Sequence, residues 1–213
     1  LDANEGRRIW EKLLQQEYKV AEPKWAFSGS PIVQGSVLYV DVGRIVALNK
    51  VNGEELWSTS DYGPAYSTPT LFTFNNHLLL AGFPEFGLVV IDATSGQEFA
   101  SHRWETRYGV NAATPIVEGD RLFVSTGYET GCAVLQLSSR GLDVVWENRE
   151  MHNKMATCVL VENHLYGFDE SILKCIDFRT GEERWSQRGL GMGALMAADN
   201  KLIVISGEGD LVI

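Results

Sequence analysis

Short apolar runs separated by turn residues fill almost the whole chain. In one representative stretch the runs are Ser30 to Val33, Val37 to Val42, Arg44 to Leu48 and Glu54 to Ser58. These runs are rich in Val, Ile, Leu and Tyr, and Gly, Asn or Ser residues lie between them. Such a pattern predicts short β-strands joined by tight turns. The chain is therefore predicted to be all-β.

This four-strand unit recurs along the chain. A glycine closes the turn before the last strand of each unit, and these glycines lie 40 to 47 residues apart, at Gly6, Gly53, Gly96, Gly141 and Gly181. A period of this length is typical of repeat architectures. Four-stranded antiparallel units predict the blades of a β-propeller, because a ring of blades leaves only short, protected strand edges. We interpret residues 1–213 as a single domain with about five blades.

The small residues of the first strands indicate which strand is innermost. Ser30, Thr68 and Thr114 each precede a proline at the start of a unit, and small side chains fit a crowded axis. The tryptophan of the last strand is then an outer residue, which buries its large ring against the neighbouring blade. The segment from Trp10 to Tyr18 has a helix-like sequence but is expected to be a connection rather than a helix.

Charge and hydropathy exclude some partners. The chain has 28 acidic and 18 basic residues, a formal net charge of −10, which disfavours binding to the phosphates of nucleic acid. No apolar run is long enough to span a bilayer, so no membrane span is predicted. The sequence shows no signal peptide.

Cysteines, histidines and paired acids are weak candidates for chemistry here. Cys132, Cys158 and Cys175 are odd in number, lie in apolar runs and lack the spacing of zinc ligands, so they are expected to be buried thiols. No two histidines have metal-ligand spacing, so neither a metal site nor a catalytic histidine is assigned. Asp169 and Glu170 are adjacent, and neighbours on a strand point to opposite faces, so a solvated turn is expected there.

The spacing Asp-x-x-x-Gly-x-x-x-Trp carries a family resemblance. It is complete at Asp2, Gly6 and Trp10 and at Asp177, Gly181 and Trp185. One further copy has Asn49 in place of the Asp, before Gly53 and Trp57, and another has Ala100 in place of the Trp, after Asp92 and Gly96. The remaining copy is a longer variant with Gln136, Gly141 and Trp146. These repeats resemble the tryptophan-docking repeats of the PQQ-type β-propellers. That group includes the quinoprotein alcohol dehydrogenases and the BamB-type outer-membrane assembly lipoproteins.

The resemblance implies a ring of seven or eight blades and an extracytoplasmic, periplasmic location. The five units are thus expected to be an arc of a larger propeller, although five units could also close if Leu1 to Trp10 completed the last blade. The resemblance also implies that Trp10, Trp57, Trp146 and Trp185 dock neighbouring blades together with the turn glycines Gly6, Gly53, Gly96 and Gly181.

The resemblance implies a non-catalytic scaffold of the BamB type that binds a protein or peptide, with a small ligand also possible. The alternatives are a PQQ-dependent dehydrogenase and an envelope sensor domain. The dehydrogenase reading needs an adjacent cysteine pair and the segments that bring in calcium ligands, and the sequence has neither. No cofactor, no metal and no catalytic residue are therefore predicted.

Binding residues are expected where the repeat is interrupted. The segment 103–114 departs most from the repeat and supplies Trp104, Arg107, Tyr108 and Asn111; Tyr128 and Tyr66 lie in two other irregular segments. Loops that break a repeat with aromatic and Arg residues often carry function. We expect these side chains, with the connection Met151 to Thr157, to face one opening as a funnel for a small ligand or peptide. The competing interpretation is that Trp104 fills the seam left open by Ala100.

Overall fold

The computed structural model describes residues 1–213, the whole chain. It contains nineteen strands and one helix, α1 (Leu14–Tyr18). The strands are β1 (Ile32–Gln34), β2 (Val37–Asp41), β3 (Ile45–Asn49), β4 (Glu55–Ser58), β5 (Thr70–Phe74), β6 (His77–Gly82), β7 (Gly87–Asp92), β8 (Glu98–Arg103), β9 (Ile116–Glu118), β10 (Arg121–Thr126), β11 (Gly131–Ser138), β12 (Gly141–Asn148), β13 (Val159–Val161), β14 (His164–Asp169), β15 (Ile172–Asp177), β16 (Glu183–Gln187), β17 (Ala194–Ala198), β18 (Lys201–Ile205) and β19 (Leu211–Val212).

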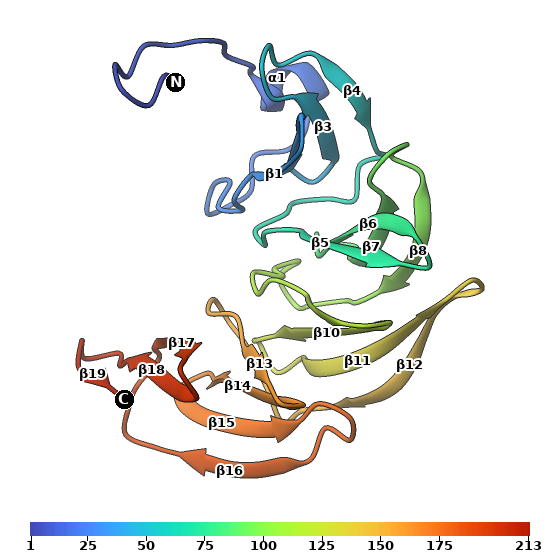
Figure 1. Ribbon diagram of the computed structural model, residues 1–213. Helices are drawn as coiled ribbons and strands as arrows, with labels where there is room; N and C mark the ends of the chain where they lie inside the picture. The colour runs from blue at the N-terminus through green and yellow to red at the C-terminus, as the bar shows by residue number, and fades with distance from the viewer.

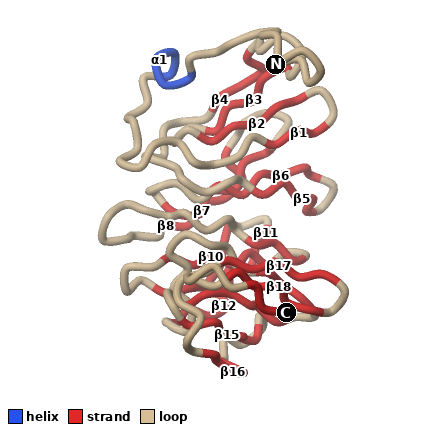
Figure 2. Tube along the Cα trace, turned by 90° about the vertical axis from the view of Figure 1, so that its left-hand side faces the viewer, coloured by secondary structure: helices blue, strands red, loops and turns tan.

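These strands form five antiparallel sheets in chain order. The first four sheets have four strands each, β1–β4, β5–β8, β9–β12 and β13–β16, and the last has three, β17–β19. The sheets follow one another along an open arc, with the first strand of each sheet toward the inside and the last strand toward the outside (Figure 1). Seen from the side, the first sheets lie one above another and α1 lies at the edge of the first sheet (Figure 2). The all-β prediction and the blade-like units are confirmed.

Burial on both faces explains why the middle strands are so apolar. Successive side chains of a strand point to opposite faces, so a sheet with a neighbour on each side needs apolar residues throughout. In β6, Leu79 packs toward the third sheet and Leu80 toward the first, and neither side chain is exposed. We number the four interfaces between neighbouring sheets as the first to fourth seam, in chain order.

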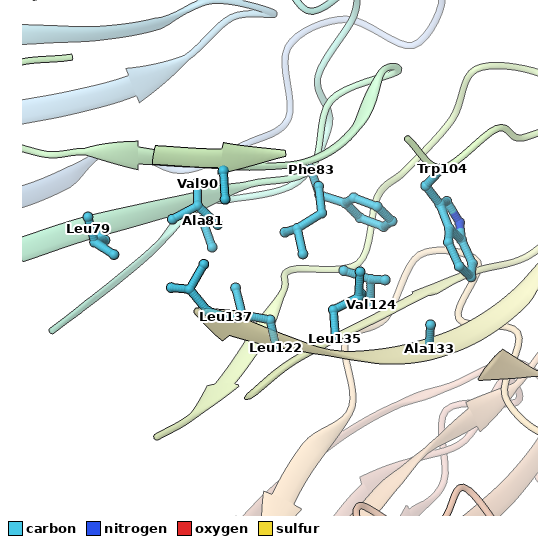
Figure 3. Close-up of a cluster of buried hydrophobic side chains, with 12 residues drawn as sticks. Leu79, Ala81, Phe83, Val90, Trp104, Leu122, Val124, Ala133, Leu135 and Leu137 are labelled. Carbon is cyan, nitrogen blue, oxygen red and sulfur yellow. The ribbon is translucent and has the colours of Figure 1, made fainter. Parts of the chain in front are cut away.

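The largest core cluster fills the second seam. Twelve buried residues from β6–β8, β10, β11 and the adjoining loops make up this cluster. Figure 3 shows Leu79, Ala81 and Phe83 facing Leu122, Leu135 and Leu137 across the seam. Clusters of seven and eight buried residues fill the first and third seams.

The repeated glycine turn has the same geometry wherever its pattern is kept. The glycine N–H donates to the carbonyl of the preceding Asp or Asn at 2.8 to 2.9 Å, and that residue's side-chain oxygen accepts a further backbone N–H two residues on. Gly6, Gly53, Gly96 and Gly181 adopt φ angles between +66° and +75°, in the left-handed region that favours glycine.

Three of the tryptophans lie on the glycine turn of the next sheet. An added Cβ would come within 2.7 Å of the Trp10 ring at Gly53, 2.6 Å of Trp57 at Gly96 and 2.7 Å of Trp146 at Gly181. Each indole Nε1 also donates to a turn carbonyl: Trp10 to Lys50, Trp57 to Ala93 and Trp146 to Phe178, at 3.0 to 3.2 Å. The turn glycine therefore provides both the left-handed backbone and the space for the ring.

Trp185 and Gly6 do not make this contact within the chain. The side chain of Trp185 packs on Tyr166, with 5.9 Å between ring centroids, but the residue stays 40% exposed. No atom lies within 4 Å of an ideal Cβ on Gly6. Their suggested role in docking blades stays a prediction.

Two expectations about the connections need correction. Residues 7–10 form no strand, because no third strand lies beside them. The segment after Trp10 does contain a helix, α1, whose Leu14 and Tyr18 pack on Val42, Val46 and Leu48 of the first sheet. The open arc that the sequence favoured is confirmed: the first and last sheets do not meet, so Leu1 to Trp10 does not complete the sheet β17–β19 (Figure 1).

Candidate functional site

The candidate site is a cavity at the ends of the inner strands, which we call the inner pocket. Its volume is about 660 Å³, within the range of about 300 to 1,000 Å³ that is typical of ligand pockets. It is lined by Trp25 and Ser28 before β1, Tyr66 and Thr68 before β5, Val110, Ala112 and Thr114 before β9, Tyr128 between β10 and β11, and Lys154, Met155 and Thr157 before β13. Five segments from four different sheets therefore meet there.

Hydroxyl groups join these segments to one another. Thr68 Oγ1 accepts the Ser30 N–H at 2.9 Å, and Thr157 Oγ1 accepts the Thr114 N–H at 3.0 Å. Ser28 Oγ donates to the Tyr66 carbonyl at 3.0 Å. Small hydroxyl residues precede the inner strands because their hydroxyl groups link neighbouring sheets. The sequence showed that these residues are small but not that their hydroxyls form hydrogen bonds between sheets.

Two pairs of aromatic side chains lie at the inner pocket. Trp25 packs against Tyr66 with 6.1 Å between ring centroids, and Tyr108 packs edge-on against Tyr128 at 5.1 Å. Tyr66 and Tyr128 are predicted residues that line the pocket, and Tyr108, 57% exposed, extends the wall outward. Trp25 was not predicted, although a tryptophan in an irregular segment before the first complete unit was an available signal.

Three cationic groups lie over these rings. Lys154 Nζ is 5.2 Å from the Tyr128 centroid, the Arg107 guanidinium is 5.4 Å from that of Tyr108, and Lys24 Nζ is 4.8 Å from that of Trp25. Contacts of this kind are favourable because the ring face carries negative charge. Arg107, the remaining exposed member of the predicted set, therefore belongs to the rim of the pocket.

Two predicted residues lie elsewhere: Trp104 and Asn111 are only 4% and 1% exposed, inside the second seam. The Trp104 Nε1–H donates to Thr126 Oγ1 at 3.2 Å, and the Thr126 hydroxyl donates to Asn111 Oδ1 at 2.8 Å. Asn111 Nδ2 donates in turn to the Pro84 carbonyl at 2.8 Å. The expectation that Trp104 and Asn111 face the opening is wrong, and Trp104 instead packs in the seam that Ala100 leaves without a tryptophan.

A second polar group joins β14 and β15 to the connection before β13. Asp169 accepts from His152 Nδ1 at 2.6 Å and from Lys174 Nζ at 2.8 Å, and Glu150 and Glu183 lie 3.4 and 3.3 Å from the same Nζ. Burial favours a higher pKa for Asp169, but the hydrogen bonds from His152 and Lys174 outweigh it and lower the pKa below its usual value. Asp169 is therefore a partly buried ion-pair residue rather than part of a solvated turn, and it anchors this connection.

Asp41 is a buried acid in the first seam, beside Gly82. Its Oδ1 accepts the Gly43 N–H at 2.9 Å, while its Oδ2 has no hydrogen-bond partner. An ideal Cβ on Gly82 would lie 3.3 Å from that free oxygen. Burial raises the pKa of Asp41 to about 6, against the smaller lowering effect of the Gly43 hydrogen bond.

The three cysteines are free and buried, as predicted from their number and strand positions. Burial raises the pKa of Cys132 to about 12, and its Sγ donates to Asn148 Oδ1. Cys158 Sγ donates to Asn153 Oδ1 at 3.0 Å. Such thiols stay protonated and unreactive.

No group of three or more His, Cys, Asp or Glu side chains is arranged to hold a metal ion. The one helix has five residues and no helix is long and apolar enough to cross a membrane. The inner pocket combines aromatic side chains, hydroxyl groups and cationic groups.

Solved structures with the same fold are similar to most of this chain. They include BamB from Moraxella catarrhalis, with a TM-score of 0.59 and 12% identity over 86% of this chain and 62% of that one. The computationally designed Ika8 protein gives a TM-score of 0.63 and 15% identity, over 85% and 56%. The quinohemoprotein alcohol dehydrogenase ADHIIG from Pseudomonas putida HK5 gives 0.56 and 13%, over 85% and 39%. At these identities the likeness shows the propeller fold alone.

The sequence comparisons identify a family, whereas the structural comparisons show only the fold. The outer membrane protein assembly factor BamB of Kangiella koreensis is 32% identical over 130 residues, which are 60% of this chain and 30% of that protein. The match thus spans less than a third of the relative's length. The family model described as outer membrane protein assembly factor BamB matches residues 1–187. The chain therefore belongs to the BamB family of β-propeller proteins.

Proposed function

We propose that the chain is a non-catalytic, protein-binding scaffold that serves outer-membrane protein assembly outside the cytoplasm. The observation that carries this proposal is the inner pocket, where aromatic rings and hydroxyls from five segments surround a cavity of about 660 Å³. Aromatic residues are enriched at the centres of protein interfaces because they bury much area at a small entropic cost. Membership of the BamB family supports a protein partner and this location.

The reactive side chains support a role without catalysis. A nucleophile needs exposure and a lowered pKa, whereas the thiols of Cys132 and Cys158 are buried and their pKa values are raised. His152 is held by Asp169 next to the Lys174 ammonium, in a small cavity separate from the inner pocket. Neither arrangement places a base beside a nucleophile.

A quinone cofactor with calcium does not fit the inner pocket. Its lining residues include no carboxylate, so a calcium ion would have no anionic ligand there. The cysteines are not adjacent in sequence and none lines the pocket. We therefore propose a function that needs no bound cofactor.

Photo-crosslinking in cells of the source organism tests the scaffold proposal. A photoreactive residue replaces Met155, which lines the pocket and is 69% exposed, and in a matched control replaces Val144 on the outer strand β12, which is 44% exposed. We expect adducts with proteins of outer-membrane assembly from position 155 and not from position 144. Equal adducts from both positions, or dye-linked alcohol oxidation after incubation with PQQ and calcium, would contradict the proposal.

A further inference from the structure

We propose that the inner pocket binds an extended acidic segment of its protein partner, with a carboxylate at Lys154 and an apolar side chain against Val110 and Ala112. This inference rests on the proposed scaffold function and adds the chemistry of the partner.

The positive charge of the inner pocket favours an acidic partner. Lys154 is the one charged residue among the eleven that line the pocket, in a chain whose formal net charge is −10. Lys24 and Arg107 add positive charge at the rim. None of the three cations has a carboxylate partner within 4.0 Å, unlike Lys174, which has three. An approaching carboxylate therefore finds uncompensated positive charge, and repulsion from acids is absent among the lining residues.

Lys154 is also held in place before any partner binds. The preceding residue, Asn153, is 1% exposed and uses its backbone and side chain in four hydrogen bonds of 2.9 to 3.0 Å. The backbone and Cβ of Lys154 lie against Gly127, where an added Cβ would meet Lys154 Cβ at 3.1 Å. A side chain that starts from a fixed backbone loses less entropy on binding, which favours affinity.

The surroundings of the pocket favour an extended segment over a small carboxylic acid. Trp25, Tyr108 and Met155 are 53%, 57% and 69% exposed, so apolar surface continues beyond the cavity in more than one direction. A small acid would leave this surface in water. Thr68 and Thr157 each accept a backbone N–H and keep their own hydroxyl hydrogen, which is free to donate to a peptide carbonyl.

Binding of a short capped peptide, in which aspartate alternates with leucine, tests the inference by calorimetry or by Trp25 fluorescence. We expect this peptide to bind about tenfold more tightly than the same peptide with asparagine, and expect the difference to shrink in high salt. Lys154→Gln should weaken binding about fivefold. Lys154→Arg keeps the charge and should restore most of the affinity, and Lys201→Gln, an exposed lysine outside the pocket, should have no effect.

The outcomes separate this inference from the scaffold proposal. Equal affinity for the aspartate and asparagine peptides, or unchanged affinity in Lys154→Gln, overturns the acidic preference. Succinate that binds as tightly as the aspartate peptide also overturns it, because the site then selects small acids. If crosslinks from position 155 persist while the peptide preference fails, the scaffold proposal stands and the partner chemistry is wrong.

Discussion

The first and second seams join neighbouring sheets in two different ways. In the first seam Trp57 packs at the glycine turn: its ring lies on Gly96 and its Nε1 donates to the Ala93 carbonyl. In the second seam Ala100 replaces that tryptophan, and the turn at Gly141 has no atom within 4 Å of an ideal Cβ. The large aromatic residue is instead Trp104, at the end of β8, with its polar edge on Thr126.

The two seams also differ at the strand ends away from the glycine turns. The first has the unpaired Oδ2 of Asp41 beside Gly82, whereas the second has the neutral hydrogen-bonded series Trp104, Thr126 and Asn111. Each of these two seams contains one indole, which lies on the glycine turn of the next sheet in the first seam and in the connection after β8 in the second. In the second seam, Trp104 also forms part of a hydrogen-bonded polar network close to the inner pocket.

Removing the indole of Trp104 should have the largest effect on the free energy of unfolding. Trp104→Ala deletes a fully packed ring from the twelve-residue cluster and leaves the Thr126 hydroxyl without its donor. We expect a loss of about 4 kcal/mol in the free energy of unfolding, measured with a chemical denaturant. Trp25→Ala, at an exposed tryptophan, should change it by less than about 0.5 kcal/mol. A loss below about 1 kcal/mol for Trp104→Ala would refute its role in the seam.

Neutralising the acid of the first seam should stabilise the protein. The raised pKa of Asp41 means that the folded state prefers the protonated acid, so its favourable contribution is complete below about pH 4 and is lost as the pH rises through about 6. Asp41→Asn should therefore be about 3 kcal/mol more stable than the wild type at pH 7. Near pH 4 the two proteins should be equally stable.

Asp177→Asn provides a control of opposite sign. The hydrogen bond from Arg184 lowers the pKa of Asp177 to about 2, so the stabilisation by Asp177 is present above its unfolded pKa and is lost as the pH falls toward 2. The variant should be less stable than the wild type at pH 7, and the gap should narrow in acid. If the free energy of unfolding of Asp41→Asn differs from that of the wild type by the same amount at every pH from 4 to 7, Asp41 titrates normally.

The contact between Trp57 and Gly96 in the first seam can be tested by substituting the glycine. Gly96→Ala introduces a Cβ 2.6 Å from the Trp57 ring at φ +74°, whereas Gly119→Ala introduces one at φ +62° with no atom within 4 Å. Both variants strain the left-handed backbone by about 1 kcal/mol or more, and Gly96→Ala should be a further 2 kcal/mol or so less stable because Trp57 must move. Thermal unfolding of the pair measures the difference. Equal losses would mean that the indole contact contributes nothing.

The smallest expected effect concerns the polar network of the second seam. Thr126→Val keeps the shape but removes the hydroxyl that links Trp104 to Asn111. We expect a loss of about 1 kcal/mol, because two buried polar groups lose their partner. Thr126→Ser retains the hydroxyl and should restore the network. If the serine and valine variants are equally stable, the hydrogen bonds at this position are not stabilising.

The sequence was sufficient to predict the sheets. Strands buried on both faces are continuous apolar runs, so β6 and β7 were recognisable from composition, and four of the five glycine turns showed where a last strand begins. The helix α1 was missed because its five residues form by packing on the first sheet, through Leu14 and Tyr18, rather than from strong local preference.

The site was only partly predictable. A seam and an opening both accept aromatic residues, so the composition of segment 103–114 could not show that Trp104 is buried while Tyr108 is exposed. Asp169 was misjudged because its partners, His152 and Lys174, come from separate elements. Tyr66 and Tyr128 were placed correctly at the pocket because they interrupt the repeat at the ends of inner strands. Whether they bind a partner stays a prediction.

The large cluster of the second seam has a consequence for hydrogen exchange. A backbone amide exchanges with solvent only when its surroundings open, and the most heavily buried elements open last. The cluster joins β6–β8 to β10 and β11 in the middle of the arc, whereas α1 and β19 lie near its ends (Figure 1). Amides of β7 and β11 should therefore be the last to exchange.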